Sequence, residues 1–360
     1  MKKTNVLVIF GGKSSEYSVS LKSSSAVLRN IDREKYNVTM LGINKMGKWY
    51  KYDGEIDNIE NDTWEKCGKI TSAMLNADTS MKSLIVLNND KTFESIEIDV
   101  VFPVLHGKNG EDGTMQGLLE LSGIPYVGCD HISSGNCMDK ELTHIVLDAH
   151  GIKTAKYVAL KKCDLKDIDL VCENFEKQLG FPMFIKPAKA GSSVGVTKAK
   201  NKDELKKSIE NAFLHDTKLV AECAIVGKEV ECAVLGNDNP KSSILGEIAP
   251  TAEFYDFDAK YNDASTGLHI PARIDDNMTQ KVRETAVRAY KALGCSGFTR
   301  VDFFVTDNGD IILNEPNTIP GFTSISMYPK LWEKTGVPFS ELIGKLITFA
   351  IEKNKENNNG

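Results

Sequence analysis

The sequence predicts a mixed α/β and α+β chain built from three folded units. Its first third alternates apolar strand segments with amphipathic helix segments, which is the pattern of an open α/β sheet. From about residue 139 the order of elements changes to that of two α+β units. We therefore expect an N-terminal α/β domain at 1–138, a central unit at 139–226, a C-terminal unit at 227–353 and a flexible polar tail at 354–360.

The N-terminal unit is predicted from two apolar strands and two helices. Residues 5–10 and 98–107 are nearly continuous apolar runs, typical of parallel strands that are buried on both faces. Apolar positions at helical spacing predict a helix over 18–31, and a second helix ends at Gly123. The remaining segments are a strand at 36–43, a hairpin at 47–54 and a polar, irregular insertion at 51–95.

The two later units combine short strands with helices. The central unit is expected to contain helices at 139–150, 167–178 and 204–215 and strands at 154–160, 181–187, 191–199 and 219–225. The C-terminal unit is expected to contain strands at 229–236 and 242–250, a long loop at 251–267, a helix at 279–294 and a hairpin at 300–317. A loop of this length inside a compact domain is usually functional or disordered, and its four aromatic residues argue against disorder.

Composition excludes several classes of protein. The chain of 360 residues is 41% hydrophobic and 26% charged, as soluble globular proteins are, and it carries a net charge of −6. Nucleic-acid-binding domains are usually basic, so we expect no nucleic-acid partner. No apolar run approaches the roughly 18 residues that cross a membrane. Eight scattered cysteines without a CxxC pair and no signal peptide predict a cytoplasmic protein with free thiols.

The hairpin at 300–317 has an informative register. Asn308-Gly309 between two apolar runs is typical of a two-residue type I′ turn. Side chains repeat every second residue along a strand, so residues that such a turn pairs two positions apart share one face. The pairs predicted on that face are Asp302 with Glu315 and Arg300 with Asn317.

Two opposed carboxylates on that face need a compensating charge, because like charges repel across a strand pair. Arg300 or a metal ion could supply it. Asp302, Glu315 and the amide oxygen of Asn317 form a hard oxygen set that suits Mg²⁺, which uses few protein ligands. The alternative is a solvated hairpin face with a surface ion pair.

A second chemical signal is a strand that runs into a lysine and then into small residues. Lys186 lies near the end of the strand at 181–187, and Gly191, Ser192 and Ser193 follow it. Their backbone N–H groups can form an anion-binding concavity with Lys186 as charge partner and Lys140 as a second cation. Phosphate and Mg²⁺ sites in one chain point to ATP held between the two α+β units, unless the lysines are ordinary surface residues.

Other nucleotide and catalytic motifs fit less well. A Walker loop would need a glycine at position 7, where the chain has Leu7, and no GxGxxG occurs. Gly191, Ser193 and Gly195 match the GxSxG elbow of serine hydrolases, which lies between a strand and a helix. Because no helix is expected before about Asp203, a serine hydrolase remains a distant alternative.

Several longer stretches resemble one enzyme family. They are IFGGKSSEYSVS, PVLHGKNGEDGTMQG, FIKPAKAGSSVGV, FYDFDAKY and LNEPNTIPGFTSIS. The chain resembles the ATP-grasp ligases, specifically the D-alanine–D-alanine ligase family and its vancomycin-resistance relatives, from Val6 to about Glu352. The patterns HGxxGEDGxxQG and NxxPGFT together are highly specific. The resemblance implies an ATP-grasp fold behind an N-terminal pre-ATP-grasp domain.

The resemblance also implies a reaction and its residues. ATP would phosphorylate the carboxylate of one D-alanine, and the amine of a second D-amino acid would displace phosphate, in peptidoglycan precursor synthesis. ATP binding would fall to Lys140, Lys186, Gly191, Ser193, Glu222, Glu229 and Lys260. Catalysis would fall to Glu16, Ser192, Tyr261, Arg300 and Gly321. Substrate contacts would fall to Glu16, His106, Ser326 and Met327. Two Mg²⁺ ions, or Mn²⁺, would bind Asp302, Glu315 and Asn317.

Some of these roles have plain structural alternatives. Tyr261 could pack in its loop, His106 could be a satisfied structural histidine, and Ser326 and Met327 could merely line the site. Lys260 and Tyr261 would lie on a lid over the nucleotide. The family suggests a homodimer.

The second substrate is expected to be D-alanine, with D-serine as the alternative. The N-terminal half looks most like ligases that make D-Ala-D-Ser, but Tyr261 is the residue expected in D-Ala-D-Ala ligases. Met327 stands where D-Ser and D-lactate relatives commonly carry arginine, and an apolar side chain suits a methyl group better than a hydroxymethyl group. Apolar pockets reject a single hydroxyl only weakly, by about 1–3 kcal/mol.

Overall fold

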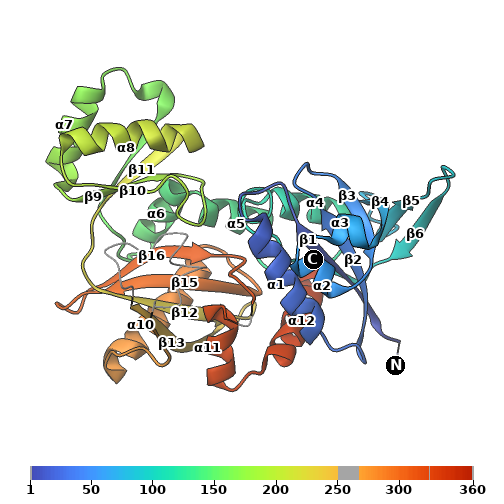
Figure 1. Ribbon diagram of the computed structural model, residues 1–360. Helices are drawn as coiled ribbons and strands as arrows, with labels where there is room; N and C mark the ends of the chain where they lie inside the picture. Colours follow the sequence, from blue (N-terminus) through green and yellow to red (C-terminus); the bar gives the residue numbers. More distant parts are fainter. Residues whose placement is uncertain (1, 250–266, 324, 359–360) are drawn as a thin grey trace.

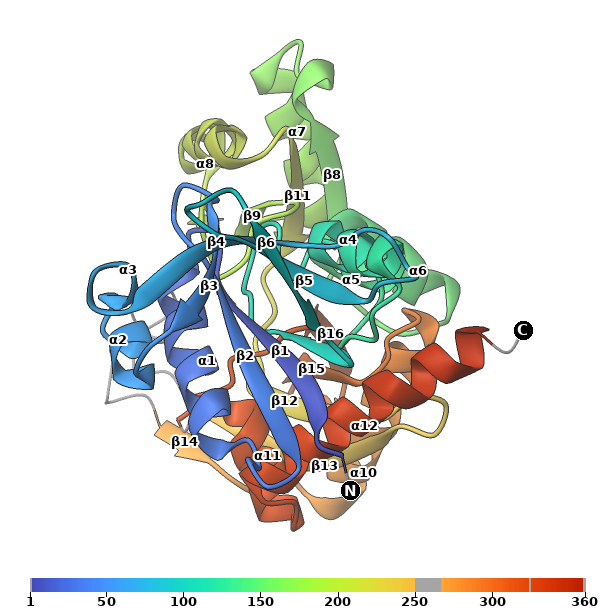
Figure 2. The same ribbon diagram turned by 90° about the vertical axis from the view of Figure 1, so that its right-hand side faces the viewer.

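The computed structural model describes residues 2–249, 267–323 and 325–358, and this part of the chain forms three sheets (Figures 1 and 2). A seven-stranded sheet lies within 1–138, a four-stranded sheet within 139–226 and a five-stranded sheet within 227–353. Figure 1 shows the first sheet on the right, the second at the upper left and the third at the lower left. The predicted class is confirmed, and the domain boundaries stay predictions.

The N-terminal sheet is built around β1 (Thr4–Gly11), which is parallel to both of its neighbours. Val6, Val8 and Phe10 pack into one core, whereas Leu7 and Ile9 pack into another on the opposite face. Burial on both faces explains why the strand is an unbroken apolar run. The strand order is β6-β5-β4-β3-β2-β1-β7, with β2 (Tyr36–Ile43), β3 (Trp49–Asp53), β4 (Lys69–Leu75), β5 (Ser83–Leu87), β6 (Phe93–Glu97) and β7 (Val100–Pro103).

The prediction of an irregular insertion at 51–95 is wrong. This segment forms α2 (Ile56–Glu60), α3 (Trp64–Cys67) and the strands β4 to β6, which extend the sheet in antiparallel order. β4 and β5 combine buried with exposed residues, and β6 has no buried residue, so these strands are much more polar than β1. Their polar composition concealed the strands, as is usual where one face of an antiparallel sheet meets solvent.

Helices on the N-terminal sheet come from both ends of the chain. α1 (Tyr17–Asn30) and α4 (Thr114–Ser122) lie near their predicted positions, and α4 ends at Gly123 with a φ of +64°. α5 (His131–Met138), which follows, was not predicted. The last helix, α12 (Phe339–Asn358), returns to this sheet, where Leu346 shares a core with Val6. The N-terminal domain is thus completed by C-terminal residues.

The central sheet has the antiparallel order β10-β9-β11-β8, and α7 and α8 cover it (Figure 1). The strand predicted at 191–199 is only three residues long, because residues 188–196 form a loop. The unit contains α6 (Lys140–Ala149), β8 (Tyr157–Lys161), the short 3-10 helix Lys162–Asp164, α7 (Ile168–Leu179), β9 (Met183–Pro187), β10 (Thr197–Ala199), α8 (Lys202–His215) and β11 (Lys218–Cys223).

The C-terminal sheet has the order β14-β13-β12-β15-β16. The helix predicted to start at 279 starts at Asp276, because the Asp275 carboxylate accepts a hydrogen bond from the Met278 N–H and caps it. The unit contains β12 (Lys228–Leu235), β13 (Lys241–Ala249), β14 (Gly267–His269), α10 (Asp276–Ala292), β15 (Phe298–Val305), β16 (Ile311–Asn317) and α11 (Met327–Thr335).

The predicted two-residue turn between β15 and β16 is wrong, although the pairs deduced from it are present. Thr306 and Asp310 flank a three-residue turn, with Gly309 at a φ of +81°, so the tip of the hairpin pairs one residue out of the predicted register. A bulge at Asn314 then shifts the strands back. Asp302 therefore faces Glu315, and Arg300 faces Asn317, as predicted.

The loop after β16 is clamped to the N-terminal domain at three backbone atoms. The Ile319 N–H donates to Glu111 Oε1 at 3.1 Å, and the Ile319 carbonyl accepts from His106 Nδ1 at 3.0 Å. The Phe322 N–H donates to Ser23 Oγ at 3.2 Å, and that hydroxyl lies 2.9 Å from His106 Nε2. Because a carbonyl can only accept, His106 carries its proton on Nδ1 and accepts from Ser23 at Nε2.

Ser23→Ala is expected to lower the free energy of unfolding by about 1–3 kcal/mol, because it leaves His106 Nε2 and the Phe322 N–H buried without this partner. Chemical denaturation of the two proteins measures the difference.

Ser25→Ala is the matched control on the same helix. Ser25 is buried, and its hydroxyl has no hydrogen-bond partner within the described residues, so its removal should change stability by less than about 0.5 kcal/mol. Equal losses in both variants would contradict the clamp.

Candidate functional site

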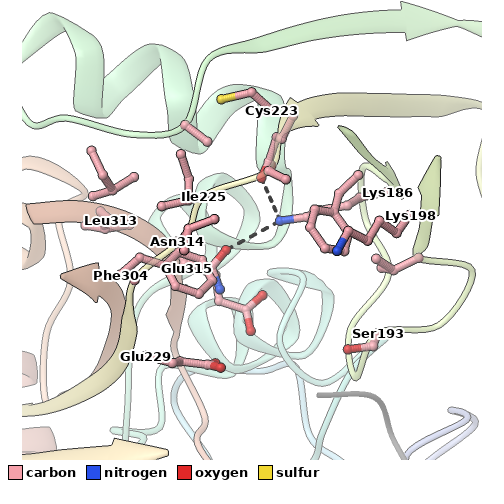
Figure 3. A pocket seen from close by; sticks show the side chains of 18 of the residues that line it. Lys186, Ser193, Lys198, Cys223, Ile225, Glu229, Phe304, Leu313, Asn314 and Glu315 are labelled. Atoms are coloured by element: carbon pink, nitrogen blue, oxygen red, sulfur yellow. Dashed lines mark hydrogen bonds and ion pairs between the residues drawn. The ribbon is translucent and has the colours of Figure 1, made fainter. Parts of the chain in front are cut away.

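A cavity of about 520 Å³ lies between the central and C-terminal sheets. Its apolar walls include Phe184, Phe304 and Leu313 (Figure 3). An apolar cleft with a few convergent charged groups is the usual form of a small-molecule site. The predicted site residues that line it are Lys140, Lys186, Ser193, Glu222, Glu229 and Glu315.

Lys186 is held on the cavity wall by a buried carboxylate. Its ammonium lies 2.6 Å from Glu222 Oε2 and 3.4 Å from Asn314 Oδ1, and Figure 3 shows it pointing toward Asn314. The bulge in β16 places Asn314 here. Glu222 Oε1 lies 3.0 Å from His144 Nε2. Burial alone would raise the pKa of Glu222, but Lys186 and His144 outweigh it and lower this pKa to about 2.

The glycine- and serine-containing loop joins β9 to β10 in the central unit and contacts the N-terminal domain. Ser192 and Ser193 both adopt left-handed backbone conformations, with φ of +48° and +58°. The Ser192 hydroxyl donates to Glu16 Oε1, and Lys140 Nζ donates to the Ala190 carbonyl at 2.8 Å. Side chains from two domains therefore fix the start of this loop.

The hairpin carries an excess of carboxylates around one guanidinium. Arg300 donates from Nε and Nη2 to the two oxygens of Asp302, at 2.7 Å each, and lies 3.1 Å from Glu231 Oε2. Glu231 and Glu315 flank Asp302 on the neighbouring strands. Burial would lower the pKa of Arg300, but Asp302 and Glu231 raise it well above its ordinary range. Among the described residues, the carboxylates of Asp302, Glu231 and Glu315 all lie near this guanidinium.

These groups fit a divalent cation that takes only part of its ligands from protein. Within the described residues, no three acidic, histidine or cysteine side chains converge to hold a metal by themselves. Asn317 donates from Nδ2 to Asp302 Oδ2 at 3.0 Å, so its amide oxygen is not used in that bond. The oxygen-rich set and its negative excess suit Mg²⁺, which usually keeps waters and phosphate oxygens.

The N-terminal side of the site contains a buried acid, Glu16, and a half-buried one, Glu111. The Glu16 carboxylate approaches Gly107 and Gly191, where an added Cβ would lie 2.1 and 2.8 Å from Oε2. Gly107, whose φ is +70°, therefore requires glycine, whereas a side chain at position 191 would displace the Glu16 carboxylate. Glu111 Oε2 accepts from the Gly107 N–H at 2.6 Å. Burial and the Glu16 carboxylate raise the pKa of Glu111 well above its ordinary range.

His106 is a buried, uncharged ring in this arrangement. Burial lowers its pKa to about 4, and both ring nitrogens have protein partners. Its imidazole thus orients the loop after β16, and direct substrate contact through a ring nitrogen has no geometric support here.

The residues predicted for the second substrate lie beyond this loop. Ser326 Oγ lies 2.8 Å from Thr323 Oγ1, and a Cβ on Gly321 would come within 2.9 Å of it. Met327 is 6% exposed and its sulfur packs against Gly246 of β13. Because Met327 packs in a hydrophobic core, its apolar side chain does not indicate a methyl-bearing second substrate. Lys260 and Tyr261 lie outside the described residues.

Sequence reasoning missed four residues of the site. Glu111 stands in the HGKNGEDG stretch, and Glu231 is two positions from Glu229 on the same strand face, so both had a signal. Asn314 reached the cavity through an unpredicted bulge. His144 resembles an ordinary helix residue, and its partner Glu222 is far away in the sequence.

The serine-hydrolase alternative does not survive the geometry. Ser193 lies in a loop between the antiparallel strands β9 and β10, and the next helix, α8, starts only at Lys202. A nucleophile elbow needs a strand directly before and a helix directly after the serine.

None of the helices among the described residues has the length and apolar character to span a membrane.

Comparison with known proteins gives a consistent result along the chain. Residues 5–129 match the family model "D-ala D-ala ligase N-terminus", and residues 146–348 match "D-ala D-ala ligase C-terminus". A D-alanine--D-alanine ligase of Caldicellulosiruptor bescii is 48% identical over 359 residues, covering 99% of this chain and 97% of the relative. The Clostridium acetobutylicum enzyme of the same name is 47% identical, covering 98% and 99%.

Two solved structures match the fold over nearly the whole chain. The VanG D-Ala:D-Ser ligase of Enterococcus faecalis has a TM-score of 0.88 and 45% identity, covering 97% of this chain and 100% of that one. The D-alanine-D-alanine ligase of Coxiella burnetii also has a TM-score of 0.88, with 34% identity, covering 100% and 97%. The predicted ATP-grasp fold is confirmed by these matches.

Glu222→Gln is expected to destabilise the protein at neutral pH by roughly 3 kcal/mol, because it leaves Lys186 without its buried carboxylate. The pKa of Glu222 in the folded state, about 2, is below that of an ordinary glutamate, 4.5. The stabilisation is therefore complete above about pH 4.5 and is lost as the pH falls toward 2.

Urea unfolding of both proteins between pH 7 and pH 3.5 tests this. The gap between them should be constant above about pH 5 and should narrow below it. A gap that widens on acidification would contradict the assignment.

Proposed function

The chain belongs to the D-alanine–D-alanine ligase family, and we propose that it joins two D-alanines at the expense of ATP, through a D-alanyl phosphate, for peptidoglycan precursor synthesis. One observation carries the proposal. The cations Lys140 and Lys186 share a cavity with Glu315 of the carboxylate hairpin, and the loop beside them reaches Glu16 of the N-terminal domain. A nucleotide and an amino acid would meet where these elements converge.

ATP would lie in the cavity with its phosphates toward the loop at 191–193. Lys140 and Lys186 would offset phosphate charge, and backbone N–H groups of Gly191 and Ser193 would donate to phosphate oxygens. The base would occupy the apolar region near Phe304, with Glu229 at the ribose end, and Glu222 would act on the nucleotide through its ion pair with Lys186.

Arg300 would act where negative charge develops. Its guanidinium is half-buried and already fixed by Asp302, so it needs little reorganisation to stabilise the transferring phosphoryl group and the tetrahedral oxyanion. Gly321 would add a backbone N–H to that oxyanion. Asp302, Glu315 and Asn317 would hold Mg²⁺, or Mn²⁺, which would neutralise phosphate charge when bound.

Glu16 would bind the ammonium group of the first D-alanine. Ser192 donates to Glu16 and so couples this contact to the phosphate loop. The uncharged His106 would keep the loop containing Gly321 in register. Lys260 and Tyr261 would close over the nucleotide and exclude water from the acyl phosphate. Ser326, near Gly321, would contact the second substrate.

A second candidate is the ligation of D-alanine to D-serine. The VanG D-Ala:D-Ser ligase matches this chain with 45% identity and a TM-score of 0.88, and the burial of Met327 removes one argument for a methyl-bearing second substrate. We retain D-alanine because the matched relatives from Caldicellulosiruptor bescii and Clostridium acetobutylicum carry that name. We also infer a cytoplasmic homodimer from the family.

Phosphate release with ATP, Mg²⁺ and D-alanine alone is the deciding measurement, with products identified by mass. D-alanyl-D-alanine should form without any other amino acid. Adding D-serine at equal concentration should leave the alanyl dipeptide as the main product. Release that depends on D-serine would instead support the second candidate.

Asp302→Asn is expected to lower turnover by a factor on the order of 10³ or more, because it disturbs both the Arg300 pair and the proposed metal site. Steady-state phosphate release at varied Mg²⁺ measures this. Asp307→Asn, in the exposed turn of the same hairpin, is the control and should keep near-normal turnover. Near-normal turnover of Asp302→Asn would remove the hairpin from the mechanism.

A further inference from the structure

A buried histidine behind Lys186 has no part in the reaction described above. His144 lies on α6, is 4% exposed, and faces strands β8 and β11 of the central sheet. Its Nε2 lies 3.0 Å from Glu222 Oε1, and its Nδ1 lies 2.7 Å from Thr154 Oγ1. The ring stacks on Tyr157 with centroids 4.1 Å apart and planes 12° apart. Three contacts therefore fix both its position and its rotation.

The two oxygens of Glu222 are divided between two partners. Lys186 donates to Oε2 at 2.6 Å, and His144 faces Oε1. An ionised carboxylate only accepts, so His144 Nε2 carries a proton. Nδ1 lies 2.7 Å from the Thr154 hydroxyl, so both ring nitrogens have protein partners. The hydrogen-bond chain runs from Thr154 through His144 and Glu222 to Lys186.

This division of the carboxylate matters for phosphate binding. A free carboxylate could rotate and take the Lys186 ammonium with both oxygens, or turn into the cavity toward a phosphate that it would repel. His144 holds Oε1 away from the cavity, so a single oxygen meets Lys186. The flexible lysine side chain is thereby ordered in advance, which reduces the entropy lost when it binds an anion.

We propose that His144 is a positioning residue for nucleotide binding, acting through Glu222 to hold the Lys186 ammonium ready for the phosphates of ATP. This assignment rests on the proposed function. It gives the imidazole no contact with substrate and no proton transfer. Its effect should fall on the affinity for nucleotide rather than on the chemical step.

Three substitutions separate the hydrogen bond from the packing. His144→Phe keeps an aromatic ring on Tyr157 and removes the donor. His144→Gln places an amide N–H near the position of Nε2, whereas His144→Asn places it near Nδ1 and cannot reach Glu222. His150→Phe is the matched control, because His150 is an exposed histidine just past the end of the same helix.

The measurement is the dissociation constant of a non-hydrolysable ATP analogue with Mg²⁺, on the full chain, beside thermal unfolding midpoints. His144→Phe and His144→Asn should weaken binding on the order of tenfold, the usual effect of losing a hydrogen bond to a charged group. His144→Gln and His150→Phe should stay within about threefold of wild type. In turnover assays, KM for ATP should rise while kcat and KM for D-alanine change little.

Each outcome has a distinct meaning. Wild-type-like binding by His144→Phe would overturn the assignment, and so would His144→Gln binding as weakly as His144→Asn at equal unfolding midpoints. If His144→Phe does not fold, the Gln and Asn pair decides. No binding by the wild-type chain would overturn the proposed function and this role with it. Binding without D-alanine ligation would count against the proposed function alone.

Discussion

The clamp on the loop after β16 is the constraint on which the rest of the site depends. Glu111, His106 and Ser23 hold backbone atoms of Ile319 and Phe322, and none of these side chains belongs to the hairpin that they position. The carboxylates of that hairpin are thereby tied to the strand ends of the N-terminal sheet. Because α12 also returns to this sheet, the N-terminal domain and the C-terminal unit share one hydrophobic core. The central unit contacts the N-terminal domain through Ser192 and Glu16, and it contacts the C-terminal unit through the backbone bond from Leu313 to Lys153.

Charge is balanced differently at the two ends of the cavity. Lys186 is offset by Glu222, so this end can accept phosphate without carrying a large positive excess. Around Arg300 the balance is reversed, with Asp302, Glu231 and Glu315 nearby. Such a gradient suits a ligand that brings both an anion and its bound cation. Each charged group is held by neighbours in advance, which is the condition under which buried electrostatics favours a transition state.

Local patterns in the sequence predicted most of the fold, and pairings between distant residues accounted for the failures. β1 and the helix ending at Gly123 follow directly from apolar periodicity. The strands at 69–97 were missed because many of their residues are polar and exposed. Asp302 and Glu315 were found through a register argument, whereas His144 needed a contact across the central sheet that no local pattern encodes. Family resemblance supplied most of the other site residues, among them Glu229 and Glu16.

The bulge at Asn314 divides the hairpin into two segments with different pairing registers. From the turn to Phe303 the strands are counted in one register, and from Asp302 onward in another. A relative with a turn one residue shorter could keep the same carboxylate pair without the bulge. If such a relative were aligned with this chain at the turn, the residue matched to Glu315 would be displaced by one position from the true equivalent. Comparisons of the proposed metal ligands across these enzymes should therefore be anchored on Arg300 and Asn317, at the end of the hairpin away from the turn.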